Sequence, residues 1–325
     1  MWKYLAVGGI LVVGFGVGFF ARQLGEPTGG PTPSTNETDA EEATVLPRLS
    51  VTVPKRTLET PEPAAPELEV VQDQTKSTAD MLDEELLTAI REAEPEQRAI
   101  ARDELVKRYR EAGKERKALT IELEGATGDA RVSIFKKTEV LNKKLEATRN
   151  RTELGKIYKV QRGDTLTRIG NHYKISANYI RKLNGIKGDM ILIGQKLKVV
   201  QGPFNVMVDK SDFRLTVFLG DQFYREYPIG LGVDGSTPVG EFVVQGKLKE
   251  PTWWHDGASY DYGDPHNPLG TRWITIQSDY GIHGTWAEDS IGQEKSHGCV
   301  RMLNKNVEAL FELLVTNHSK IAIRE

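Results

Sequence analysis

The sequence predicts a multidomain protein: an N-terminal transmembrane helix, a helical spacer, a small βααβ module and a mostly-β C-terminal domain. Two patterns support this fold class. An uncharged apolar stretch and a proline-rich acidic stretch open the chain, and later apolar residues change from helical to alternating spacing. At about 150 residues per domain, 325 residues also suggest about two folded units. The net charge of -3 gives no reason to expect a nucleic-acid partner.

Residues 1–25 are predicted to form a signal anchor. Residues 4–21 carry no charge, Lys3 precedes them and Arg22 follows them. This length is enough to cross a bilayer core of about 30 Å. The end of the stretch lacks the small-residue pattern of a cleavage site, which favours an uncleaved anchor. Lys3 favours an N-terminus inside, so the rest of the chain is expected outside the cytoplasm.

Residues 26–77 are predicted to be a disordered linker. Residues 26–75 hold 8 of the 15 prolines, no aromatic residue, and 10 acidic against 3 basic side chains. Such a composition buries too little apolar surface to offset the entropy lost on ordering. Proline and charge repulsion also extend the chain, so this segment is expected to provide reach.

Residues 78–156 are predicted to form a helical spacer. Apolar residues such as Leu86, Ile90 and Leu105 recur at helical spacing. Pro95 suits the first turn of a second helix, and Asp129 is a candidate N-cap for a third. Residues 80–156 hold 17 acidic and 17 basic side chains, which favours a solvated spacer, with pairing to a partner as the alternative.

Residues 157–201 are predicted to fold as a βααβ module. Tyr158 and Val160 alternate like a strand, and Asp164 or Thr165 can cap the helix that follows. Ser176 can cap a second helix that ends near residues 184–185, after which residues 197–199 return as a strand beside the first.

This module resembles a LysM domain. The matching motifs are Y-x-V-x-x-G-D-T-L (158–166), L-N-G (183–185) and G-Q-K-L-K-V (194–199). The resemblance implies binding of N-acetylglucosamine-containing glycan between two loops. Ile193 departs from the proline that the family usually has there. The glycan-binding positions implied are Gly163, Asp164, Thr165, Leu166, Met190, Ile191, Leu192 and Ile193. The alternative is that these residues only hold the small fold together.

Residues 203–325 are predicted to form the mostly-β domain. Alternating stretches indicate strands at 204–208, 215–219, 222–228, 241–245 and 272–277. The convincing helix lies near the end, where Val307, Leu310 and Leu314 recur at helical spacing.

The reactive side chains of this domain concentrate in residues 282–302. The thiolate of Cys299, the single cysteine, would attack acyl carbons, but an ordinary thiol needs a base such as His283 or His297. Gly298 lets backbone amides approach a developing oxyanion, and Arg301 can bind a carboxylate through two hydrogen bonds. Cys299, His283 and His297 lack an evident fourth ligand for zinc, so neither a metal nor a cofactor is predicted.

This domain resembles the L,D-transpeptidase (YkuD-type) catalytic domain over about 120 residues. The matching motifs are T-P-V-G-E-F (237–242), N-P-L-G-T-R-W (267–273), H-G-T (283–285) and S-H-G-C-V-R (296–301). The resemblance implies that Cys299 is the nucleophile, His283 the general base and the Gly284 carbonyl the group that orients it. It also implies an oxyanion hole made of the backbone N–H groups of His297, Gly298 and Cys299.

Four further roles remain open in this region. Ser296 and His297 are expected to fix the nucleophile loop through hydrogen bonds, with an electrostatic role for His297 as the alternative. Arg301 is expected either to contact substrate or to form a salt bridge within the loop. Trp286 stands where relatives often carry a polar residue, which leaves the shape of the entrance open. The expected substrate-binding positions are Arg301, Ser296 and Trp286.

The two resemblances together imply a peptidoglycan L,D-transpeptidase of the bacterial cell envelope. Such an enzyme cleaves a stem tetrapeptide, releases D-alanine, forms a thioester on cysteine and makes 3→3 cross-links. Carbapenems would acylate the same cysteine. The alternatives are an L,D-carboxypeptidase that uses water as acceptor, and a non-catalytic tether between membrane and wall. The expected partners are peptidoglycan and, through residues 4–21, the inner membrane.

Overall fold

The computed structural model describes residues 77–79, 81–148, 152–278 and 280–325. The predicted anchor (1–25) lies outside these residues, and so does the predicted linker (26–77) apart from its last residue. Within the described ranges, no helix is both long enough and apolar enough to cross a bilayer.

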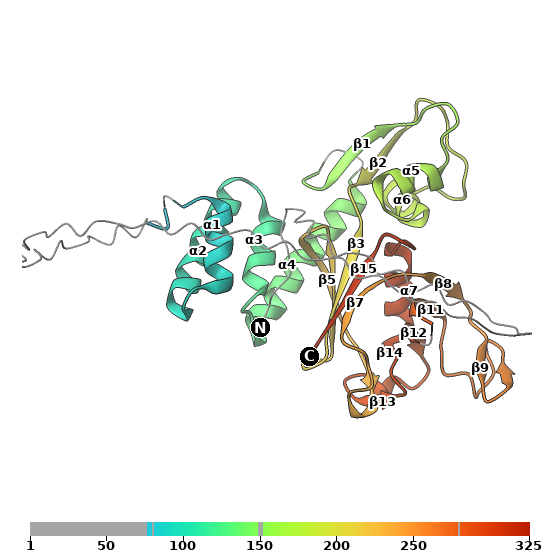
Figure 1. Ribbon diagram of the computed structural model, residues 1–325. Helices are drawn as coiled ribbons and strands as arrows, with labels where there is room; N and C mark the ends of the chain where they lie inside the picture. The colour runs from blue at the N-terminus through green and yellow to red at the C-terminus, as the bar shows by residue number, and fades with distance from the viewer. Residues whose placement is uncertain (1–76, 80, 149–151, 279) are drawn as a thin grey trace, which may run out of the picture. The chain divides into compact units, whose positions relative to one another are not determined.

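Four helices open the described part of the chain (Figure 1). They are α1 (Asp83–Glu92), α2 (Pro95–Glu111), α3 (Glu115–Leu123) and α4 (Gly128–Ala147). Pro95 occupies the first position of α2, as predicted. Two details differ from the prediction: α3 is an additional helix, and α4 begins at Gly128, with Thr127 rather than Asp129 in the N-cap position.

The expectation of a solvated spacer is wrong for α3 and α4, because both helices pack against the edge strand β5 (Gln222–Pro228). Arg116, 2% exposed, donates from Nη1 to the Phe223 carbonyl at 3.0 Å and from Nη2 to Asn142 Oδ1 at 2.9 Å. Asn142 in turn donates to the Tyr224 carbonyl at 2.7 Å. The side chains of α3 and α4 therefore satisfy backbone groups that an uncovered edge strand would expose.

This contact gives a stability prediction. Arg116→Ala leaves the Phe223 carbonyl and Asn142 Oδ1 without their buried donor, so we expect the free energy of unfolding to fall by about 3 kcal/mol. Urea denaturation followed by circular dichroism measures this change. The control is Arg110→Ala, which removes a much more exposed guanidinium and should cost less than about 1 kcal/mol. Equal losses would contradict a structural role for the α3–β5 contact.

The βααβ module has the predicted order. It comprises β1 (Gly155–Lys159), α5 (Leu166–Tyr173), α6 (Ala177–Asn184) and β2 (Lys196–Val200), with β1 antiparallel to β2. Thr165 caps α5 by accepting from the Arg168 N–H, and Ser176 caps α6 by accepting from the Tyr179 N–H. The second helix ends at Gly185, whose φ of +61° suits glycine.

The C-terminal part is mostly β, as predicted. One sheet has the order β5-β4-β3-β15-β7, and the other has the order β14-β12-β11-β8. The first also contains β3 (Phe204–Asp209), β4 (Arg214–Leu219), β7 (Gly240–Val243) and β15 (Lys320–Arg324). The second contains β8 (Gly246–Lys249), β11 (Arg272–Gln277), β12 (Tyr280–Thr285) and β14 (Val300–Leu303). The strands predicted in this part of the chain correspond to β3, β4, β5, β7 and β11.

Smaller elements complete this part of the chain. Two short pairs join β9 (Trp253–His255) to β10 (Ala258–Tyr260) and β6 (Leu231–Gly232) to β13 (Glu294–Ser296). Single 3-10 turns form at Val233–Gly235 and Glu288–Ser290. Helix α7 (Asn304–Leu313) follows β14 directly and packs against β11, β12 and β14 (Figure 1).

The two faces of the second sheet carry different side chains: one face is apolar, and the other carries His283 and Arg301. Ile274, Ile282 and Val300 are cross-strand partners on β11, β12 and β14, and all three are buried. Side chains alternate between the two faces of a strand, so the next residue on each strand points the opposite way. That opposite face carries Trp273, His283 and Arg301, which are also cross-strand partners.

Candidate active site

The pairing of β12 with β14 brings the two candidate catalytic residues together. The strands are parallel, with His283 opposite Arg301 and Ile282 opposite Val300. Cys299 directly precedes Val300, so it lies level with Gly281, one pleat away from His283. Cys299 itself lies outside β14, and its thiol interacts with the Gly281 backbone and the Arg301 guanidinium. Residues that are 16 positions apart in sequence thus become neighbours through strand register.

His283 is held in one orientation by the next residue. Its Nδ1 lies 2.6 Å from the Gly284 carbonyl oxygen. A carbonyl can only accept, so Nδ1 carries the proton and Nε2 is left with the basic lone pair. The residue is 3% exposed, and burial lowers the pKa of His283 to about 4. The imidazole is therefore neutral at pH 7 and able to accept a proton.

The candidate nucleophile is protonated in the resting protein. Burial raises the pKa of the Cys299 thiol, while the Gly281 backbone and the Arg301 guanidinium act in the opposite direction. The thiol and the imidazole are therefore both neutral at pH 7, rather than a thiolate and an imidazolium.

The loop that carries Cys299 is fixed by Ser296 and two glycines. Ser296 Oγ donates to the Cys299 carbonyl at 2.6 Å and accepts from the Gly298 N–H at 3.2 Å. Gly298 has a φ of +130°, and a Cβ there would lie 2.5 Å from a ring carbon of Tyr280. A Cβ on Gly232 would lie 2.6 Å from the Gly298 Cα. Position 298 therefore requires glycine, and its N–H is engaged inside the loop.

The contacts expected of His297 and Arg301 within the loop are not formed among the described residues. His297 is exposed and has no hydrogen bond to any described residue, so Ser296 alone of this pair fixes the loop. Arg301 makes no ion pair within the described residues, where Asp289 pairs instead with Lys295 at 3.0 Å. The Arg301 Nε is buried without a partner there, so the loop salt bridge is not formed.

Two further observations concern the surroundings of the site. Trp286 is 52% exposed, and its ring lies 6.2 Å from that of Tyr262. Among the residues that the structure describes, no three His, Cys, Asp or Glu side chains are grouped so as to hold a metal ion.

Sequence analysis missed Asn304, the first residue of α7. Its Oδ1 accepts from the Thr271 N–H at 3.0 Å, and its Nδ2 donates to the Thr285 carbonyl at 3.1 Å. These bonds bracket Gly284, where a Cβ would lie 2.1 Å from Asn304 Oδ1. Gly270 packs equally closely, since its Cβ would lie 2.5 Å from the Gly284 carbonyl carbon. The N-P-L-G motif thus supports the backbone that orients His283, which only the tertiary structure reveals.

The positions implied for glycan binding divide into two groups. Leu166 is 3% exposed, so its side chain belongs to the core, and Ile191 packs against that core. Asp164 accepts from the Tyr158 hydroxyl and the Gln161 N–H, both at 2.7 Å, and so holds the turn. Gly163 and Thr165 lie exposed at that turn. The apolar side chains exposed in the second loop are Met190, Leu192 and Ile193, at 81%, 67% and 71%.

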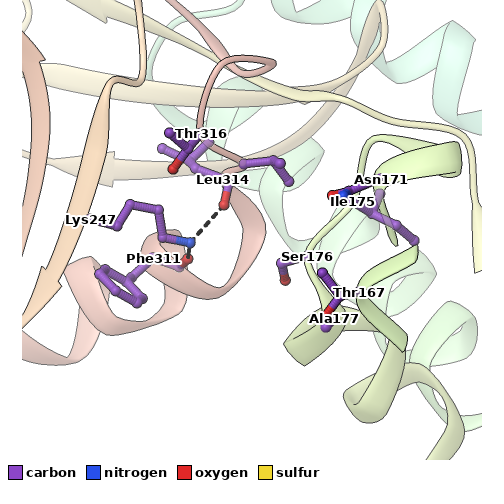
Figure 2. Close-up of a pocket in the computed structure, with 10 residues that line it drawn as sticks. Thr167, Asn171, Ile175, Ser176, Ala177, Lys247, Phe311, Leu314 and Thr316 are labelled. Carbon is purple, nitrogen blue, oxygen red and sulfur yellow. Dashed lines mark hydrogen bonds between the residues drawn. The ribbon is translucent and has the colours of Figure 1, made fainter. Parts of the chain in front are cut away.

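A cavity of about 430 Å³ lies away from these groups, between α5 and the C-terminal end of α7 (Figure 2). Lys247 projects into it and donates to the carbonyls of Phe311 and Leu314 (Figure 2). Burial lowers the pKa of Lys247 to about 8. Lys247 therefore caps α7, and because no predicted site residue lines the cavity, we do not assign it to the active site.

Comparisons with known proteins support both resemblances. The family model described as the L,D-transpeptidase catalytic domain matches residues 203–323. The LysM domain model matches residues 158–200. A segment of an autolysin from Enterococcus faecalis is 43% identical over 53 residues, which cover 16% of this chain and 7% of that protein.

Similar proteins include solved structures of low identity. The catalytic domain of an Enterococcus faecium L,D-transpeptidase is 21% identical, with a TM-score of 0.32, and the match covers 37% of this chain and 96% of that one. An L,D-transpeptidase from Mycobacterium tuberculosis is 14% identical, with a TM-score of 0.33, over 55% of this chain and 96% of that one.

Curated relatives are closer in sequence. The putative L,D-transpeptidase YqjB of Bacillus subtilis is 38% identical over 34% of this chain and 65% of that protein. The putative L,D-transpeptidase YkuD of the same organism is 30% identical over 51% of this chain and 97% of that protein. Because the similarity to YkuD spans nearly the whole of that relative, the chain belongs to the YkuD-type L,D-transpeptidase family of peptidoglycan-modifying enzymes and carries a LysM domain before its catalytic domain.

Proposed function

We propose that the protein forms 3→3 cross-links in bacterial peptidoglycan through a thioester on Cys299. The observation that carries this proposal is the parallel pairing of β12 with β14. Cys299 directly precedes β14, and the paired strand β12 carries a buried, neutral His283 whose Nδ1 is bound to the Gly284 carbonyl. A nucleophile, a base and a group that orients the base are the parts that covalent acyl transfer requires.

The first half of the proposed reaction forms the acyl-enzyme. The thiol proton of Cys299 passes to Nε2 of His283 as the sulfur atom attacks the carbonyl carbon of the third stem residue. The negative oxygen of the tetrahedral intermediate would face backbone N–H groups of the nucleophile loop other than that of Gly298, which donates to Ser296 Oγ. Collapse breaks the peptide bond, the imidazolium returns its proton to the leaving amine, and D-alanine departs. The thioester carbonyl now holds the donor stem.

The second half transfers the stem. An amine from a second stem attacks the thioester carbon and gives its proton to His283, and the proton then returns to the departing sulfur. Water in place of that amine would make the protein an L,D-carboxypeptidase. Arg301 is proposed to bind the carboxylate of the terminal D-alanine, since its guanidinium has no ion pair in the described residues and a buried, unpartnered Nε.

Mass spectrometry of muropeptides tests this function. The full chain is incubated with purified disaccharide tetrapeptide, and the products are weighed. A mass of two monomers less one D-alanine supports the transpeptidase. A tripeptide product alone supports the carboxypeptidase. No product, together with no carbapenem adduct on Cys299, would contradict enzymatic activity and favour the non-catalytic tether.

The LysM domain is proposed to retain the enzyme on the glycan strands of the cell envelope. Binding of glycan between the turn at Gly163–Thr165 and the loop at 190–193 would raise the local concentration of stems near Cys299. Attachment to the cytoplasmic membrane through residues 4–21 belongs to the same proposal and rests on the sequence alone.

The exposed apolar loop gives a binding prediction. Replacing both Leu192 and Ile193 with serine removes apolar surface that glycan would cover, so we expect the affinity for purified sacculi to fall by about tenfold or more. Sedimentation of the full chain with sacculi measures the change. The matched control is Val140→Ser on α4, which is 64% exposed and lies outside the module. Unchanged retention of the double variant would contradict glycan binding by this loop.

A further inference from the structure

The base His283 has an aromatic neighbour that no motif assigns to catalysis. Trp273 on β11 is the direct cross-strand partner of His283 on β12. The two ring centroids lie 5.6 Å apart, and the ring planes differ by only 20°. This distance and tilt fall in the range of offset-stacked aromatic pairs. The indole therefore presents its π face to the imidazole.

The indole is held from both sides. Its Nε1 donates to Thr275 Oγ1 at 2.9 Å, two residues along the same strand. A Cβ on Gly281 would lie 2.6 Å from Cζ2 of Trp273, so the ring lies over the backbone of that glycine. The same Gly281 backbone interacts with the Cys299 thiol. Trp273 thus packs against both the base and the strand segment that faces the nucleophile.

The charges around His283 explain why this stack matters. Burial is the largest influence on His283 and disfavours the imidazolium, and the guanidinium of Arg301 on the paired strand β14 disfavours it as well. The Gly284 and Leu269 carbonyls favour it. No described carboxylate forms an ion pair with His283. When His283 accepts the thiol proton, the aromatic face of Trp273 can stabilise the new cation in addition to these two carbonyls.

We propose that Trp273 is a positioning residue for the base: its indole face orients the His283 imidazole and stabilises the imidazolium that forms when Cys299 loses its proton. The proposal rests on the proposed roles of Cys299 and His283. The stack between Trp273 and His283 lowers the energy of the state in which the S–H bond is broken and the proton is bound to Nε2. Thr275 supports this role by fixing the indole.

The first test measures acylation of Cys299 by imipenem, followed by intact-protein mass spectrometry on the full chain. We expect Trp273→Leu to slow acylation by about tenfold, because a desolvated cation–π contact is lost. Trp273→Phe should restore most of the rate, since it retains an aromatic face. The matched control is Trp254→Leu, which removes a tryptophan that is 75% exposed on β9 and should leave the rate unchanged.

The second test separates positioning of the base from general packing. In a His283→Asn background, Trp273→Leu should have no further effect on acylation if the indole acts through the imidazole. A tenfold loss in both backgrounds would show a merely structural role. NMR titration of the His283 ring gives an independent readout. Loss of the stack should lower the imidazole pKa, whereas an unchanged or higher pKa in Trp273→Leu would overturn the proposal.

Alkylation of Cys299 tests the role of Trp273 even if the protein does not catalyse the proposed acyl transfer. If imipenem does not acylate the wild-type protein, iodoacetamide replaces it, because alkylation needs thiolate but no acyl transfer. A slower alkylation of Trp273→Leu that is absent in the His283→Asn background would still support the inference. Equal alkylation rates for wild type and Trp273→Leu would overturn it, whatever reaction the enzyme catalyses.

Discussion

Cys299→Ser is expected to abolish cross-link formation while leaving the fold intact. A hydroxyl is much harder to deprotonate than a thiol, and the base available to it has a pKa of about 4 because of burial. A base this weak cannot remove a hydroxyl proton at a useful rate. We therefore expect the rate of muropeptide dimer formation, measured by mass spectrometry, to fall by at least about 10³-fold.

Two properties that do not depend on the nucleophile serve as controls for Cys299→Ser: the stability of the protein and its retention on sacculi. The change in volume is small, so we expect the free energy of unfolding to stay within about 1 kcal/mol of wild type. Retention on sacculi should also persist, because the proposed glycan loops lie in a separate module. Dimer formation at the wild-type rate by the serine protein would refute the assignment of the nucleophile.

The stability of the wild-type protein is expected to fall steeply below pH 6.5. The pKa of His283 is lowered by burial from 6.5 to about 4. Between these values the unfolded chain binds a proton that the folded chain does not, so the free energy of unfolding decreases as the pH falls through this window. The difference between the two pKa values corresponds to about 3 kcal/mol.

His283→Asn isolates this contribution. Asparagine retains a side-chain N–H that can reach the Gly284 carbonyl, but it does not titrate in this range. Urea denaturation at pH 7 and pH 4 should therefore show a loss about 3 kcal/mol smaller in the variant than in the wild type. Other titrating groups contribute equally to both proteins and cancel. Identical pH dependence would mean that the imidazole is charged, or exposed to water, in the folded protein.

Several elements follow from local sequence because local energies decide them. Thr165 and Ser176 cap their helices as predicted, since a side-chain oxygen two or three residues before an N–H can reach it without help from the rest of the fold. Pro95 begins α2 for a similarly local reason. Strands β3, β4 and β5 were predicted from the alternation of side chains along each segment, which is a property of the local sequence.

Other features depend on contacts between distant residues and leave no local signal. The neutral charge pattern of residues 80–156 suggested solvation, yet Arg116 reaches a carbonyl on β5 that is 107 residues away. Leu166 matched a glycan-binding motif, yet its side chain lies in the core of the module. Strands β8, β12 and β14 were not among the predicted strands, and their pairing with neighbouring strands defines them.

The sequence by itself determined the family of this protein: the order of the motifs around Cys299 and His283 indicated an L,D-transpeptidase domain and predicted a thiol nucleophile with a histidine base. Only the tertiary structure decided how these groups are tuned. Strand register sets His283 beside Trp273, and burial makes both the imidazole and the thiol neutral. Register and burial are properties of packed strands, so they cannot be read from the residues of any one segment.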